Sequence, residues 1–81
     1  MNMFTLATAA RLAAEVVTGG PCHVMRGRAV GTLYEISYGR ELIARVTPSG
    51  IEWQAQNRQP EHFFDLIHNF LPVAKRAARC W

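Results

Sequence analysis

The chain has 81 residues, of which 49% are hydrophobic and 19% are charged. This length has room for one small domain, spanning residues 1–81, and the composition excludes a wholly disordered chain. The formal net charge of +3 comes from eight arginines and one lysine against six acidic residues, well short of the dense basic clusters of a dedicated nucleic-acid-binding protein.

The first predicted element is an amphipathic helix over residues 5–18. Its apolar residues recur at helical spacing: Leu6, Ala9, Ala10, Ala13, Val16 and Val17. Gly19, Gly20 and Pro21 end this helix, because glycine accepts a left-handed cap and proline cannot continue the ladder of hydrogen bonds. The small alanines on the apolar face predict a close approach to a sheet.

The middle of the chain predicts β-strands. The candidate segments are residues 22–26, 32–38, 41–47 and 51–55. The first is short and the other three show alternating polar and apolar residues, so we expect three or four strands. Residues 47–50 form a predicted turn, with Pro48 at its second position and Gly50 at its fourth.

The short connections also predict how the strands pair. A loop at 47–50 pairs Val46 with Ile51, Ala44 with Trp53 and Leu42 with Ala55. A three-residue loop at 39–41 pairs Tyr38 with Leu42, Ile36 with Ala44 and Tyr34 with Val46. The alternative, a two-residue turn at 39–40, pairs Tyr34 with Arg45 instead. The longer loop is preferred because it gathers apolar residues from three strands on one face, which leaves Leu33 and Ile43 exposed on the other.

The last predicted element is a helix that starts near Pro60. Apolar residues recur at steps of three and four: Phe63, Ile67, Phe70, Ala74, Ala77 and Trp81. Pro72 lies within this pattern and removes one backbone hydrogen bond of the helix, although the apolar spacing continues through it. We therefore expect either a kinked helix or two short helices in line.

Together these elements predict an α+β fold, in which an N-terminal and a C-terminal helix pack on one face of an antiparallel meander. The order α-β-β-β-α resembles that of the double-stranded-RNA-binding domain. In that family a lysine-rich KKxAK segment begins the last helix, whereas residues 59–63 here read QPEHF. The resemblance is therefore limited to the order of elements, and no RNA-contacting residue carries over.

The two cysteines, Cys22 and Cys80, lie near opposite ends of the sequence and belong to no CxxC pair. We expect free thiols in a reducing compartment rather than a disulfide, because a secreted domain of this size usually has more cysteines. The alanine-rich start lacks the cation that precedes the apolar run of a signal peptide, and no stretch approaches a membrane span. The expected location is the cytoplasm.

Two groups of residues could suggest chemistry. His62, Asp65 and His68 lie three residues apart on the last predicted helix, a spacing that spreads them around its surface. Cys22 and His23 are neighbours in a strand and point to opposite faces, which prevents a thiolate–imidazole pair. The sequence also lacks a phosphate-binding glycine loop. We therefore expect no metal, no cofactor, no catalytic residue and no enzymatic activity.

The expected function is that of a small non-enzymatic module that binds another protein or a nucleoprotein complex. The candidate contact residues are Glu35, Arg40, Ile43 and Arg45 on the open sheet face, with Arg76 and Arg79 on the last helix. Small domains without motifs include accessory inhibitors that phages and plasmids use against host defence complexes. The alternative is a weakly basic nucleic-acid-binding domain that uses surface arginines. Homodimerisation through the open sheet face or an edge strand is compatible with both.

Overall fold

The computed structural model describes residues 2–60 and 62–79, which form two helices and one four-stranded sheet. In chain order the elements are α1 (Met3–Thr18), β1 (His23–Arg26), β2 (Tyr34–Tyr38), β3 (Glu41–Thr47), β4 (Gly50–Trp53) and α2 (Phe63–Arg79). The strands are antiparallel and lie in the order β1-β2-β3-β4, so the sheet is a meander. The predicted α+β class and order of elements are confirmed, and all four candidate strands form.

Helix α1 begins two residues earlier than predicted because Asn2 caps it. The Asn2 side chain accepts a hydrogen bond from the Thr5 N–H at 2.7 Å. At the other end Gly19 adopts the left-handed conformation, with φ of 79°, and donates its N–H to the Glu15 carbonyl. The buried face between these caps is made largely of alanine: Ala7, Ala9, Ala10, Ala13 and Ala14. Such small side chains let the helix backbone lie close to the sheet.

The predicted pairing of β3 with β4 is confirmed over the four residues of β4. Val46 pairs with Ile51 and Ala44 with Trp53, around a tight turn at residues 48–49. The Thr47 hydroxyl closes the turn, because it donates to the Gly50 carbonyl and accepts from the Ser49 N–H. The pairing of Leu42 with Ala55 does not form. The ladder ends at Trp53, and the Ala55 N–H donates to the Ile43 carbonyl instead.

The connection between β2 and β3 combines the two predicted alternatives. The turn holds only residues 39 and 40, because Tyr38 pairs with Glu41, so the predicted three-residue loop is wrong. The inner pairs are nevertheless those predicted, Ile36 with Ala44 and Tyr34 with Val46. A β-bulge at Ile43 absorbs the difference of one residue.

The bulge turns Ile43 into the core. Because the bulge adds one residue to β3, the alternation of faces restarts there, and Ile43 joins Ala44 on the side of the helices. The Ile43 side chain is 0% exposed, so the prediction that it is exposed on the open face is wrong. It cannot touch a partner, and it is removed from the set of candidate contact residues. Leu42, predicted to lie in the core, is half-buried instead.

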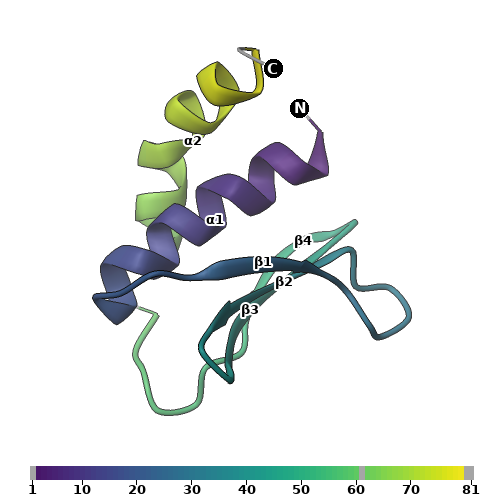
Figure 1. The fold of residues 1–81 in the computed structure, drawn as a ribbon, viewed down its shortest axis with the longest axis vertical. Coiled ribbons are helices and arrows are strands. Elements are labelled where there is room, and N and C mark those ends of the chain that lie inside the picture. Colours follow the sequence, from purple (N-terminus) through teal and green to yellow (C-terminus); the bar gives the residue numbers. More distant parts are fainter. Residues whose placement is uncertain (1, 61, 80–81) are drawn as a thin grey trace.

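Both helices lie on the same side of the sheet, as predicted, but at different depths (Figure 1). Helix α1 lies directly on the sheet, and α2 packs mainly against α1. The first residue of α2, Phe63, reaches past α1 to the sheet, where its ring meets Trp53 at a centroid distance of 4.9 Å. The opposite face of the sheet carries no described helix or loop.

Helix α2 runs without a break through Pro72, which excludes the alternative of two separate helices. Figure 1 shows that its axis changes direction along its length, which agrees with the predicted kink at proline. The Phe63 N–H donates to the Pro60 carbonyl, so the helix proper begins three residues after that proline. Trp81, which was expected to extend the apolar stripe, lies outside the described residues.

Candidate functional site

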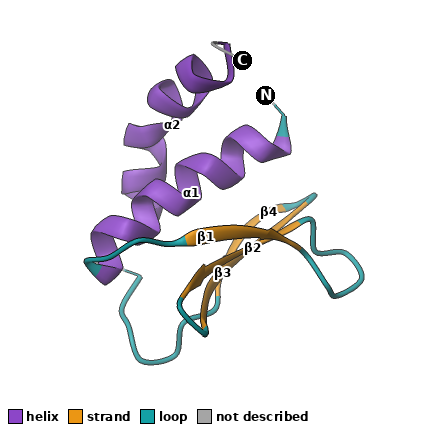
Figure 2. Cartoon of the chain, viewed as in Figure 1, coloured by secondary structure: helices purple, strands orange, loops and turns teal. Residues whose placement is uncertain are grey.

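Both helices lie on one side of the sheet, and the other face points away from them (Figure 2). On that face one row of paired residues crosses all four strands. Tyr34 touches Phe4 of α1, so the next residue, Glu35, points to the opposite side. Paired residues share a face, and the chain of partners from β1 to β4 is Met25, Glu35, Arg45 and Glu52. We call these four residues, together with Leu33, the open face.

The open face mixes apolar and charged groups. Met25 is 41% exposed and Leu33 is 38% exposed, which confirms the predicted exposure of Leu33. Met25 is the cross-strand partner of Glu35, and Leu33 precedes Glu35 by two residues in the chain. Exposed aliphatic groups next to charged ones are common in non-obligate protein interfaces, which are about as apolar as the rest of the surface.

Arg45 is held in place by a threonine rather than by a carboxylate. Its Nε donates to the Thr32 hydroxyl at 3.0 Å, and Nη2 donates to the same oxygen. Arg45 and Glu35 are cross-strand partners, as predicted, but in the described part of the chain the ion pairs are Arg11–Glu15 and Arg58–Glu41. The Arg45 guanidinium is thus drawn toward the start of β2, and Glu35 and Glu52 flank Arg45 on the neighbouring strands β2 and β4.

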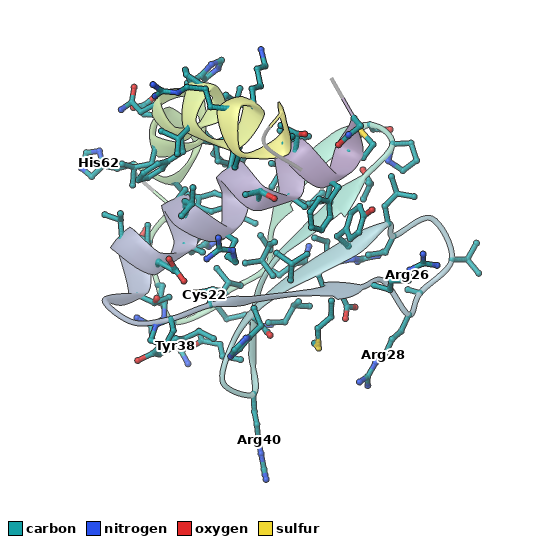
Figure 3. The ribbon with its side chains drawn as sticks, turned by 45° about the horizontal axis from the view of Figure 1, so that its top comes forward. Cys22, Arg26, Arg28, Tyr38, Arg40 and His62 are labelled. Atoms are coloured by element: carbon teal, nitrogen blue, oxygen red, sulfur yellow. The ribbon has the colours of Figure 1, made fainter. Side chains whose placement is uncertain are left out.

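Two further arginines stand at the ends of the open face. Arg40 lies in the turn between β2 and β3, and Arg28 lies in the loop between β1 and β2 at the other end of the sheet. Both are exposed, and Figure 3 shows both side chains pointing away from the helices. The open face therefore carries Glu35 and Glu52 on either side of Arg45, with an exposed arginine beyond each end of its strands.

The structure separates the predicted contact residues into two groups. Glu35, Arg40 and Arg45 come together on or beside the open face. Arg76 is exposed on α2, in the helical layer on the other side of the sheet. Arg79 is the last residue of α2, and its side chain lies outside the described part of the structure. Met25 was missed by the sequence analysis, although its place opposite Glu35 would have followed from pairing the first strand.

The loop that carries Arg28 is closed tightly at its base. The Gly27 N–H donates to the Leu33 carbonyl at 3.0 Å, and the Thr32 N–H donates to the Ala29 carbonyl at 3.1 Å. A Cβ atom on Gly27 would collide with the Thr32 carbonyl, so this position requires glycine. The loop is therefore a tight extension of the β1–β2 hairpin, and the Thr32 hydroxyl connects it to Arg45.

Cys22 is a free thiol buried between the end of α1 and the start of β1. Its Sγ lies 3.4 Å from the Thr18 hydroxyl, and its N–H donates to the Glu15 carboxylate at 3.1 Å. Burial raises the pKa of the Cys22 thiol, and the hydrogen bond with Thr18 lowers that pKa by less. The neighbouring His23 is exposed, so the two residues do not form a nucleophile and its base. The predicted free thiol is confirmed for Cys22, and Cys80 lies outside the described residues.

We expect Cys22 to be protected from alkylation in the folded protein. In a Cys80→Ser background at pH 8, iodoacetamide should modify Cys22 on the order of ten times more slowly than in 8 M urea, since burial favours the unreactive thiol. A raised pKa in the folded state also means that stability falls as pH rises through and above the thiol's unfolded value. Denaturant titrations at pH 7.5 and pH 10 should show this loss, and a Cys22→Ala variant should show less of it. Equal alkylation rates in the folded and unfolded protein would contradict the burial.

The described residues show neither of two other features that would point to function. They contain no group of three or more His, Cys, Asp or Glu side chains placed to hold a metal ion. Neither α1 nor the described part of α2 has the length and apolar content needed to cross a membrane. His62, Asp65 and His68 are all exposed.

Comparison of the chain with protein-family models, with curated proteins and with solved structures finds no match.

Proposed function

We propose that this chain is a small non-enzymatic module that binds another protein through the open face of its sheet. The observation that carries the proposal is the row formed by Met25, Glu35, Arg45 and Glu52, which crosses all four strands on the side that neither helix covers. In such an interface the burial of exposed apolar groups favours binding, and the charged groups beside them provide specificity. The sheet holds these groups in fixed positions, which reduces the entropic cost of binding.

The charge pattern defines the partner surface that this face fits. Arg45 lies between Glu35 and Glu52 in the row, and Arg28 and Arg40 lie beyond the ends of the strands. A complementary protein surface carries basic groups opposite Glu35 and Glu52 and acidic groups opposite Arg28 and Arg40.

The same pattern weighs against the alternative of a nucleic acid lying on the sheet. A phosphate backbone that bridges Arg28 and Arg40 would pass along β2 over the Glu35 carboxylate, and the resulting repulsion opposes the counterion release that drives such binding. Among protein-binding roles we favour an accessory inhibitor of a larger complex, since such a role requires one docking surface and no chemistry. The buried free thiol of Cys22 is consistent with a reducing compartment such as the cytoplasm.

The test is affinity capture from an extract of the source cells, with the bound proteins identified by mass spectrometry. A double variant, Arg40→Glu/Glu52→Lys, keeps the net charge and reverses two exposed positions at this face. It should lower recovery of the wild-type partner at least about tenfold, because each reversal places like charges together. Arg45 is a poorer choice, since reversing it also breaks its contact with Thr32.

The matched control is Asp65→Lys/Lys75→Glu, which reverses two exposed charges on α2. It should capture the partner as the wild type does, and both variants should melt within a few degrees of it. Capture that survives the open-face reversal and is lost in the α2 control would contradict the proposal. Capture that disappears after nuclease treatment would support the nucleic-acid alternative instead.

A further inference from the structure

Strand β1 is at the edge of the sheet, and its outer side meets no other described strand. The register shows which of its backbone groups are free. The Gly27 N–H bonds to the Leu33 carbonyl, and residues 27 and 33 continue the register of β1 with β2, so they occupy the position of a hydrogen-bonded pair of the antiparallel ladder. Such pairs alternate along the strand, which makes His23 and Met25 the next residues bonded to β2. The N–H and C=O groups of Val24 and Arg26 therefore point outward, where a further strand could bind them.

A groove of about 650 Å³ lies beside this edge, on the side of the helices. Its walls come from three elements, namely one face of α1, the start of β1 and the second half of α2. Its apolar lining residues are Phe4, Val24, Ala74, Ala77 and Ala78. Phe4 is 46% exposed, although its ring is held against Tyr34 at a centroid distance of 5.6 Å. The groove is thus an apolar recess next to a row of free backbone groups.

The exposed residues at the two ends of β1 are basic. His23 and Arg26 are exposed at the two ends of β1, and Figure 3 shows Arg26 at the end of the strand away from Cys22. Arg11 also lines the groove and is paired with Glu15 at 3.1 Å, and the described residues that line the groove include no Asp or Glu. A second copy of β1 would bring its own Arg26 and no acidic residue, so the edge is a poor partner for itself. An acidic segment fits it better.

We propose that an extended, acidic and apolar segment of a partner protein binds as a fifth strand along the free edge of β1. Its backbone would bond to Val24 and Arg26, and alternate side chains would enter the groove and contact Phe4 and Ala77. Four residues of β1 at about 3.3 Å each accommodate a segment of roughly four to six residues. Strand addition of this kind takes affinity from the backbone bonds and specificity from the pockets for alternate side chains. The inference rests on the proposed function in taking a protein as the partner, but it uses a different surface.

The probe is a set of linear dodecapeptides selected from a phage-displayed random library on the intact chain. The strongest binder is synthesised and measured by fluorescence anisotropy. We expect selected sequences with alternating apolar residues and at least one Asp or Glu. Amide hydrogen exchange followed by NMR should slow at least about tenfold at Val24 and Arg26 when the peptide binds, whereas Met25 should change little because its amide is already bonded.

N-methylation of the peptide, one residue at a time, tests the strand directly. Methylation at alternate residues should weaken binding at least about tenfold, because only every second N–H of an edge strand faces β1. In the chain, Ala77→Trp should fill the groove and weaken binding to a similar extent. Arg76→Trp, at an exposed neighbouring position outside the groove lining, is the matched control and should have no effect.

Several results would overturn the inference. One is a library that yields no binder, and another is a selected peptide whose N-methylation shows no alternation. Slow exchange at Val24 and Arg26 without peptide, together with a dimeric mass in sedimentation, would assign this edge to a second copy of the chain. The Arg40→Glu/Glu52→Lys variant separates the two proposals, because it should retain the peptide even though it loses the partner of the open face.

Discussion

Replacing Phe63 by alanine is expected to remove a large share of the stability of this protein. Phe63 is 0% exposed, and it is the residue through which α2 reaches the sheet at Trp53. Truncating a buried phenylalanine to alanine costs about 3–5 kcal/mol. A chain of 81 residues has a total stability of about 4–12 kcal/mol at the usual 0.05–0.15 kcal/mol per residue. The loss therefore removes much of the stability of a small protein.

The measurement is a thermal and a urea unfolding curve followed by circular dichroism. A loss of this size corresponds to a Tm lowered by about 12 °C or more. Phe64→Ala is the matched control, because the neighbouring ring is 46% exposed and should cost about 1 kcal/mol or less. Comparable losses in the two variants would mean that Phe63 does not anchor α2 in the core.

The second large effect is expected at the bulge in β3. Ile43→Ala should destabilise the protein by about 2–5 kcal/mol, because the side chain is fully enclosed. The adjacent Leu42→Ala should cost clearly less, since Leu42 is half-buried and lies opposite Ser37. The free energy of unfolding of both variants in urea gives the comparison directly.

This pair of variants separates the two registers of the β2–β3 hairpin. With the three-residue loop and no bulge, Leu42 would face the helices and Ile43 would face solvent. The order of the two losses would then be reversed, and Leu42→Ala would be the more destabilising change. Such a result would also return Ile43 to the residues that a partner could contact.

Local sequence signals determined the elements of this protein well. Helical spacing and the Gly19 cap predicted α1, and alternation predicted β2, β3 and β4, because these patterns depend on the geometry of a single segment. The turn at 47–50 also determined the pairing of β3 with β4 correctly. In the candidate site, the position of Glu35 opposite Arg45 followed from the same alternation.

The tertiary structure alone decided how these elements are completed into a core and a surface. The bulge at Ile43 exists because the two-residue turn and the apolar pairs of the inner strands require registers that differ by one residue, and burial of Ile43 reconciles them. Arg45 bonds to Thr32 rather than to Glu35 because the loop after β1 folds back to that point, which no local pattern encodes. The groove beside the free edge of β1 depends on α2 stacking on α1, a contact between the two ends of the chain. Patterns along the sequence report the geometry of one segment, whereas these features depend on where separate segments meet.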